Sequence, residues 1–177
     1  MSFVERRKVV AVCGGAALPS IEVGRLAEEL GAEILRAGMH LLTGGMGGVM
    51  EAASRGARRA KDAEHLDGLV IGILPTEDPG RANPHCDLVL PTGMGVGRNV
   101  LVIRAADAVV LVDGGSGTLS EAAYAWQLGK PIVAMAKTGG WAGRLAGQRL
   151  DTRRDDQVME AQDAGQAVEL IRHAFGD

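Results

Sequence analysis

The stretch AVVLVDGGSGTLSE, residues 108–121, joins five consecutive apolar residues to a glycine-rich turn and then to a helical pattern. A short, continuously apolar run is typical of a strand that is buried on both faces of a parallel sheet. Glycine lets the main chain turn tightly and approach a ligand closely. The first N–H groups of the following helix have no partner inside it, so they suit an anion. We therefore expect a phosphate site on Gly114, Gly115, Ser116, Gly117 and Thr118.

Two further loops repeat this pattern of apolar strand, glycines and helix. One follows an expected strand at 8–13, and the other, GGMGG at 44–48, follows an expected strand at 40–43. The carboxyl ends of parallel strands share one edge of the sheet, where ligands bind. A single glycine loop could serve only as a tight turn. Three such loops on one edge of the sheet favour the interpretation as an anion site. The ligand residues expected in these two loops are Gly14, Gly15, Gly44, Gly45, Met46 and Gly47.

Strand and helix patterns alternate along the whole chain. Further strands are expected at 69–74, 87–90, 108–112, 131–136 and 157–161, and helices at 20–37, 49–63, 96–106, 119–128 and 165–175. Residues 76–86 are predicted to be a loop, and 137–154 irregular with a turn of helix after Trp141. This alternation predicts a Rossmann-like, doubly wound α/β fold with a mainly parallel sheet and helices on both faces. The length fits one domain over residues 1–177.

Composition excludes several classes of protein. Hydrophobic residues make up 46% of the chain, too many for a disordered protein, and the net charge of −3 argues against a general nucleic-acid binder. The apolar runs are too short to cross a membrane, and the N-terminus lacks the pattern of a signal peptide. Cys13 and Cys86 lie far apart, which favours a reduced, cytoplasmic setting. The four histidines are scattered, so no metal site is expected.

Two common nucleotide-binding motifs are missing or incomplete. A Walker A loop needs Gly-Lys-Ser/Thr, which does not occur, so the chain is not a P-loop NTPase. The dinucleotide motif G-x-G-x-x-G is incomplete at the first strand, which leaves NAD or FAD binding as a minor alternative.

Two charged residues accompany the glycine loops. Glu121 falls in the first turn expected after the 114–118 loop, where its side chain leans back toward the ligand edge. Arg98 follows GMGVG at 93–97 and opens another expected helix on that edge. Each has a structural alternative, since an acid near a helix N-terminus complements the helix dipole and most arginines are structural. Together on one edge, they favour a functional site.

The residues GGSGTLSE at 114–121 resemble the P-G-G-x-G-T-x-x-E signature of the LOG ("Lonely Guy") family and the wider SLOG superfamily, formerly labelled lysine decarboxylase-like. GGMGGVM at 44–50 is similar to that family's G-G-G-x-x-G-L-M loop, and Gly97-Arg98-Asn99 falls where LOG enzymes carry an Arg-Lys pair. The resemblance runs from about Val9 to Met135. It implies that Arg98 and Glu121 are a catalytic pair that cleaves the N-glycosidic bond of cytokinin nucleoside 5′-monophosphates. It also implies a dimer or tetramer, with 49–63 and 119–128 as candidate contacts.

The chain departs from the LOG pattern at two positions. Asp113 replaces the signature proline, and Asn99 replaces the lysine. The segment 98–107 is similar to a second, bacterial branch that includes molybdenum-cofactor carrier proteins, which hold a phosphate-bearing pterin without converting it. The old decarboxylase label implies a pyridoxal phosphate lysine, and none of the four lysines has a distinctive setting, so we reject it.

Three functional hypotheses follow from these patterns. The preferred one is a protein that binds a nucleotide-like ligand, either a nucleoside monophosphate or a molybdopterin-type molecule. The alternative is a LOG-type phosphoribohydrolase that releases free base and ribose 5-phosphate. A DNA-handling protein is a remote third, since a DNA-processing family shares the superfamily fold, and the acidic charge balance argues against it.

Overall fold

The computed structural model describes residues 6–176 and contains a seven-stranded sheet in the order β4-β3-β2-β1-β5-β6-β7. All six neighbouring pairs of strands are parallel. The N-terminal residues 1–5, which bear on the expected absence of a signal peptide, lie outside the described residues. The strands are β1 (Val9–Gly14), β2 (His40–Thr43), β3 (Val70–Leu74), β4 (Leu88–Pro91), β5 (Ala108–Val112), β6 (Ile132–Met135) and β7 (Met159–Ala161).

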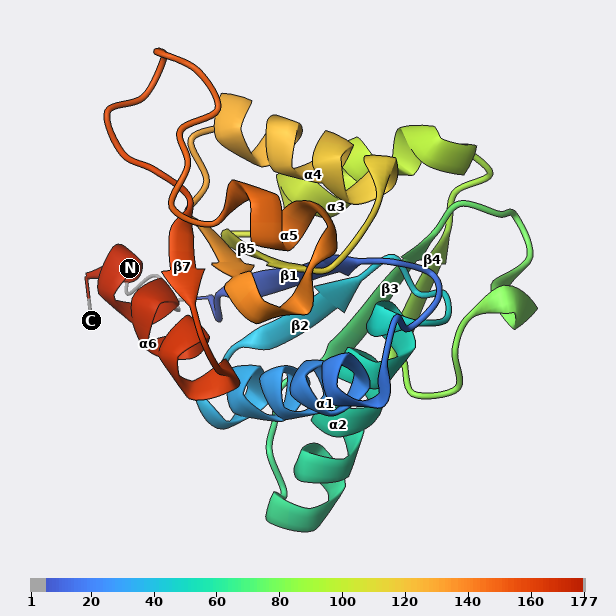
Figure 1. The fold of residues 1–177 in the computed structure, drawn as a ribbon. Helices are drawn as coiled ribbons and strands as arrows, with labels where there is room; N and C mark the ends of the chain where they lie inside the picture. The colour runs from blue at the N-terminus through green and yellow to red at the C-terminus, as the bar shows by residue number, and fades with distance from the viewer. Residues whose placement is uncertain (1–5, 177) are drawn as a thin grey trace, which may run out of the picture.

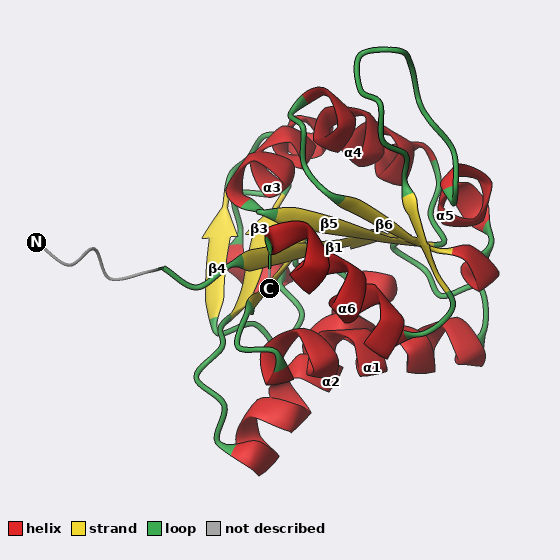
Figure 2. Ribbon diagram, turned by 90° about the vertical axis from the view of Figure 1, so that its left-hand side faces the viewer, coloured by secondary structure: helices red, strands yellow, loops and turns green. Residues whose placement is uncertain are grey.

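Helices cover both faces of this sheet (Figures 1 and 2). The α-helices are α1 (Ile21–Arg36), α2 (Val49–Glu64), α3 (Asn99–Ala105), α4 (Ser116–Gln127), α5 (Gly140–Leu145) and α6 (Ala164–Phe175), and the short 3-10 helices are η1 (Pro79–Arg81), η2 (Gly95–Arg98) and η3 (Ala136–Thr138). Helices α1, α2 and α6 pack on one face, and α3, α4 and α5 on the other. The expected Rossmann-like architecture is confirmed.

The side chains of the apolar strands pack into two separate cores, one on each face of the sheet. In β1, Val10 and Val12 point into the core beneath α1, α2 and α6, while Ala11 and Cys13 point into the core beneath α3, α4 and α5. Successive side chains of a strand face opposite sides, so a strand covered on both faces must be apolar throughout. This explains why the strands of the sequence read as unbroken apolar runs.

Several elements differ from the expected bounds at their ends. Helix α4 begins at Ser116, three residues earlier than expected, so Gly117 and Thr118 belong to its first turn. The helix expected at 96–106 is divided into η2 and α3, and the irregular segment 137–154 holds η3 and α5. Glycines at 93, 95 and 97 disfavour a continuous helix there, because glycine loses more backbone entropy than other residues.

The order of the strands places a topological switch point beside β1. From β1 the chain moves outward through β2, β3 and β4, and then returns to place β5 on the other side of β1. The helices that follow β1 and β5 therefore leave toward opposite faces of the sheet, which opens a crevice between the carboxyl ends of these two strands. Gly14 pairs with Val112 at this point, so both glycine loops begin at the crevice.

Candidate functional site

A cavity of about 300 Å³ lies in the crevice between the ends of β1 and β5. Three loops and two helix starts enclose it, and its walls are mostly main chain and small side chains. It lies near the lower end of the size range of ligand sites and suits a small molecule. Its lining residues are Val12, Cys13, Gly14, Gly15, Ala16, Gly44, Met50, Arg98, Asn99, Gly115, Ser116, Gly117, Thr118 and Glu121.

The start of α4 supplies one wall of this cavity with main-chain donors. Its N-cap is Gly115, which offers no side chain to the first N–H groups of the helix. In contrast, α1 and α6 are capped by Ser20 and Asp163, whose side chains accept hydrogen bonds from N–H groups of their own helices. A side-chain carbon added at Gly115 would meet no atom within 4 Å, so the space beside it is open. The uncapped donors and the positive end of the helix dipole face this open space, an arrangement that suits an anion.

The turn into α4 is formed by Asp113 and Gly114, both of which have positive φ angles, of 50° and 91°. A side-chain carbon at Gly114 would lie 2.1 Å from Oγ1 of Thr118, so only glycine fits there. The Asp113 N–H donates a hydrogen bond of 2.7 Å to Oγ1 of Thr138. The positive φ of Asp113 and the hydrogen bond from its N–H explain why this position departs from the signature proline. Proline has no N–H, and its φ is fixed near −65°.

The carboxylate of Asp113 does not line the cavity, but it lies between Gly140 and Gly15: a side-chain carbon added at Gly15 would lie 3.5 Å from its Oδ2. A carbon added at Gly140 would lie 2.6 Å from its Oδ1, so the group sits against the turn that begins α5. The described residues that line the cavity do not include Asp113. The acid at the beginning of the glycine loop therefore lies behind Gly15, outside the lining of the cavity.

Arg98 reaches the cavity from the end of η2 and is only 8% exposed. Its guanidinium donates one short hydrogen bond, of 2.8 Å, to Oδ1 of Asn99. Its other contacts are long: 3.5 Å to Oε1 of Glu121 and 3.4 Å to the carbonyl oxygen of Gly44. The buried Nε has no partner among the described residues. A buried guanidinium with five donors normally has more partners than this, so the site can accept a further acceptor or anion.

Glu121 lies opposite Arg98 and is 6% exposed. Burial raises the pKa of its carboxyl group to about 7, although the positive charge of Arg98 and the neighbouring thiol of Cys13 act in the other direction. Burial also raises the pKa of Cys13 well above its usual range, and the charge of Glu121 adds to this effect. Glu121 can therefore hold or release a proton near neutral pH, whereas Cys13 stays a neutral thiol.

Only some of the site residues that the sequence predicted line this cavity. Gly14, Gly15, Arg98, Glu121 and residues 115–118 line it, whereas the 44–48 loop contributes only Gly44. The carbonyl oxygens of Gly45 and Met46 instead accept hydrogen bonds from the main chain and side chain of Asn83, at 2.8 and 3.2 Å. The Val49 N–H at the start of α2 donates to Gly15. Most of this loop is thus turned toward neighbouring protein segments rather than toward the cavity.

Five residues that line the cavity were not predicted. Val12, Cys13 and Met50 occupy positions in a strand and a helix that read as core, and Ala16 has no chemical signature. Asn99 entered the sequence analysis only as a replacement for lysine, yet its side chain joins Arg98 to Ser120 and the start of α4. Its position directly after Arg98 was the signal that could have identified it.

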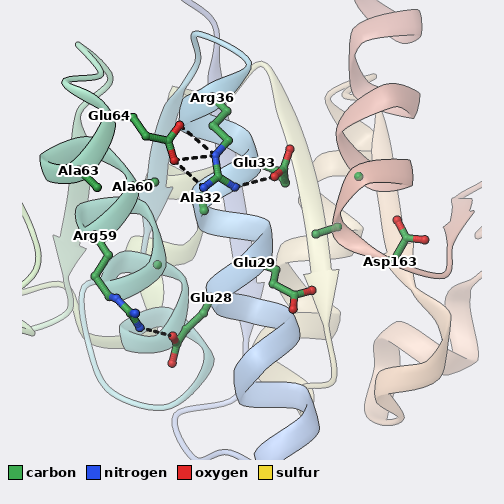
Figure 3. A pocket seen from close by; sticks show the side chains of 13 residues that line it. Glu28, Glu29, Ala32, Glu33, Arg36, Arg59, Ala60, Ala63, Glu64 and Asp163 are labelled. Atoms are coloured by element: carbon green, nitrogen blue, oxygen red, sulfur yellow. Dashed lines mark hydrogen bonds and ion pairs between the residues drawn. The ribbon is translucent and has the colours of Figure 1, made fainter.

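A larger cavity of about 750 Å³ lies over α1, α2 and the start of α6, outside the crevice between β1 and β5 (Figure 3). Its arginines are already paired: Arg36 with Glu33 and Glu64, and Arg59 with Glu28. Small residues form the floor of this groove, and the charged side chains at its edges pair with one another. Few of its charged groups are therefore free to bind a ligand. We therefore take the smaller cavity at the switch point as the candidate site.

Two searches of the described residues bear on other kinds of site. Histidine, cysteine, aspartate and glutamate form no cluster of three in residues 6–176 that could hold a metal ion. Within the same range, no helix has both the length and the apolar character needed to cross a bilayer.

The fold and the cavity together define the class of protein. Seven parallel strands, helices on both faces and a glycine-lined cavity at the switch point define a Rossmann-like α/β protein. The chain belongs to the SLOG cluster4 family, whose model matches residues 7–169. This confirms the resemblance to the SLOG superfamily that the glycine loops indicated.

Several solved structures share this fold over nearly the whole chain. The X-ray structure of TM1055, a structural-genomics target, is 34% identical with a TM-score of 0.83, and the match covers 95% of this chain and 99% of that one. The molybdenum cofactor binding protein from Rippkaea orientalis is 30% identical, with a TM-score of 0.78 and coverage of 97% and 99%. The molybdenum cofactor carrier protein from Chlamydomonas reinhardtii is 28% identical, with a TM-score of 0.80 and coverage of 97% and 100%.

Proposed function

We propose that this protein binds a phosphate-bearing, nucleotide-like small molecule in the cavity between β1 and β5. The observation that carries the proposal is the under-coordinated guanidinium of Arg98, which faces the uncapped start of α4 across one cavity. A phosphate would accept hydrogen bonds from the first N–H groups of α4 and would balance the buried positive charge. We assign Gly115, Ser116, Gly117 and Thr118 to the phosphate.

We propose a molybdopterin-type molecule as the ligand, with a nucleoside monophosphate as the other candidate. Support comes from the molybdenum cofactor proteins of Rippkaea orientalis and Chlamydomonas reinhardtii, which match this chain over almost their whole length. Gly14 and Gly15 would allow the ligand to pass close to the main chain, and Met50 and Val12 would contact its ring. Residues 1–177 would then form one ligand-binding domain in the cytoplasm, a reducing setting suited to the free Cys13 and Cys86.

The binding proposal can be tested by isothermal titration calorimetry. Wild-type protein would be titrated with AMP and, under anaerobic conditions, with molybdopterin. Arg98→Ala should weaken binding at least tenfold, because one charge-assisted contact contributes about 1.5–3 kcal/mol. Arg104→Ala is a matched control, since Arg104 is an exposed arginine on the same segment. Equal affinities of wild type and Arg98→Ala for every phosphate-bearing ligand would contradict the proposal.

A second candidate function is hydrolysis of a nucleoside 5′-monophosphate. The specific observation in its favour is Glu121, a buried carboxyl group with a pKa of about 7 that lies 3.5 Å from Arg98. Ionised Glu121 would take a proton from water as the water oxygen bonds to C1′ of the ribose. The bond from C1′ to the base would break, and the departing base would take up the proton that Glu121 received from the water. Arg98 would stabilise the negative charge that develops on the base during this step.

The two functions can be separated by incubating the protein with AMP and cytokinin monophosphates and assaying ribose 5-phosphate. Release that disappears in Glu121→Gln would establish the hydrolase and overturn the carrier. If no nucleotide is cleaved while AMP or a pterin binds, the hydrolase is excluded.

We also propose that the chain associates with copies of itself, as the LOG resemblance implies. The residues 49–63 were one candidate contact. All four basic side chains of this helix form ion pairs within the chain, so its outer face is already satisfied.

A further inference from the structure

The strongest contact of Arg98 within the protein is with an uncharged side chain, that of Asn99. Oδ1 of Asn99 accepts a hydrogen bond of 2.8 Å from Nη1 of Arg98. The same nitrogen lies 3.5 Å from Oε1 of Glu121, which is well beyond the length of a strong charged hydrogen bond. Arg98 thus makes its one short hydrogen bond among the described residues to a neutral amide, although a carboxyl group lies within reach.

A second hydrogen bond fixes the orientation of the Asn99 amide. Its Nδ2 donates at 2.9 Å to Oγ of Ser120, whose own hydrogen is donated to the carbonyl oxygen of Gly117 at 2.7 Å. The Ser120 oxygen can therefore only accept from Asn99, which places the amide oxygen toward Arg98, a side chain that can only donate. Asn99 is 9% exposed, and it joins α3 to α4, which pack side by side on one face of the sheet (Figure 1).

The surroundings of Arg98 leave its guanidinium room to move. A side-chain carbon added at Gly95 would meet no atom within 4 Å, and one added at Gly97 would approach none closer than 3.9 Å, so η2 is loosely packed at these positions. A carbon added at Gly44 would lie 2.2 Å from Nη2 of Arg98, so the guanidinium fits only because Gly44 has no side chain. A shift of about 0.7 Å would shorten the 3.5 Å contact with Glu121 to a charged hydrogen bond of about 2.8 Å.

We propose that Asn99 is a positioning residue that holds the guanidinium of Arg98 apart from Glu121 and so keeps its charge available to the phosphate of the ligand. A guanidinium in close contact with a carboxylate has its charge compensated and its donors occupied, and such a buried pair resists separation. A neutral amide occupies one donor and leaves the charge uncompensated. The effect on binding rests on the proposed function, whereas the separation of the two side chains requires no ligand.

The protonation of Glu121 reports where the guanidinium lies. Among the described residues that line the cavity, the titratable side chains are those of Arg98, Glu121 and Cys13. Burial raises the pKa of Glu121 to about 7, and Arg98, at 3.5 Å, opposes only part of this effect. A closer guanidinium would stabilise the carboxylate more strongly, and the pKa of Glu121 would fall toward its ordinary value of 4.5.

The first experiment follows the side-chain carboxyl carbon of Glu121 by NMR while the ligand-free protein is titrated with acid and base. Asn99→Ala should lower the pKa of Glu121, because Arg98 then approaches it, whereas Asn99→Asp should raise it, because a second carboxylate is added nearby. In an Arg98→Ala background, Asn99→Ala should leave the pKa of Glu121 unchanged. A merely structural role would loosen the cavity in every background and would not give shifts of opposite direction.

The second experiment measures the affinity for AMP and molybdopterin by calorimetry. Asn99→Ala and Asn99→Asp should each weaken binding about tenfold, because in both variants a carboxylate compensates the charge of Arg98. Ser120→Ala removes the support of the Asn99 amide without touching the cavity lining, so it should shift affinity and the pKa of Glu121 in the direction of Asn99→Ala. Arg104→Ala, an exposed control on α3, should change neither quantity.

Two results would overturn the proposal. One is a pKa of Glu121 that stays at its wild-type value in both Asn99→Ala and Ser120→Ala. The other is a fall of that pKa on Asn99→Ala that is equally large when Arg98 is absent. Failure of the wild-type protein to bind AMP or molybdopterin would overturn the proposed function, whereas the NMR titration uses no ligand and would still decide whether Asn99 holds Arg98 and Glu121 apart.

Discussion

The protonation of Glu121 gives a quantitative prediction about stability. The pKa of this carboxyl group is about 7 in the folded protein and 4.5 in an unfolded chain. Between these values the folded state holds a proton that the unfolded state has released, so stability falls as pH rises. From pH 5 to pH 8.5 this linkage amounts to about 2.5 kcal/mol. For a chain of this length, it lowers the melting temperature by roughly 5–10 °C.

The assay is thermal and urea unfolding of wild type and Glu121→Gln across that pH range. The variant keeps the size of the side chain and cannot ionise, so it should lose about 2.5 kcal/mol less than wild type by pH 8.5. Lowered pKa values at His40, Asp87 and Asp107 affect both proteins equally and cancel in the comparison. Parallel pH profiles for the two proteins would refute the claim that burial keeps Glu121 protonated near neutrality.

Four further predictions concern the loops around the cavity. Gly115→Ala should keep wild-type stability, since the added carbon meets no atom within 4 Å, but should weaken AMP or molybdopterin binding; unchanged affinity would place the ligand elsewhere. Gly114→Ala, with a φ of 91° and an added carbon 2.1 Å from a hydroxyl oxygen, should lose about 3 kcal/mol in urea unfolding, and a loss below 1 kcal/mol would contradict this. Asp113→Pro, which restores the LOG signature, should lose about 3 kcal/mol or more, and a neutral result would show that the loop can rearrange. Asn83→Ala and Asn83→Asp should both weaken ligand binding through the 44–48 loop, because neither side chain can donate a hydrogen bond to the carbonyl oxygen of Met46, and wild-type affinity in both variants would contradict this.

Most of the fold could be predicted because its signals are local. Each β strand needs an apolar run and each helix end needs glycine or a capping residue, and both are visible in single segments such as 108–121. Gly38 follows the first helix and has a φ of 75°, the left-handed conformation in which glycine commonly ends a helix. The bounds of α4 were less predictable, because Ser116 and Gly117 are weak helix formers and the helix starts there only because Gly115 is its N-cap.

The site was harder to predict where it depends on packing between distant segments. The contact between Asn83 and the 44–48 loop joins parts of the chain 37 residues apart, and no local pattern announces it. The orientation of Asp113 depends on the turn at Gly139 and Gly140, which follows the next strand. The burial that raises the pKa of Glu121 likewise results from the assembled cavity. The expected position of Glu121 in the first turn was wrong: α4 begins at Ser116, so Glu121 lies in its second turn.

The most direct test of the central claim is a crystal structure of the protein with a bound phosphate-bearing ligand, either AMP or molybdopterin. We predict that the phosphate oxygens lie within hydrogen-bonding distance of the N–H groups of Ser116, Gly117 and Thr118, with Arg98 facing the ligand across the cavity. A ligand seated in the groove over α1 and α2, or one whose phosphate makes no contact with the start of α4, would contradict it.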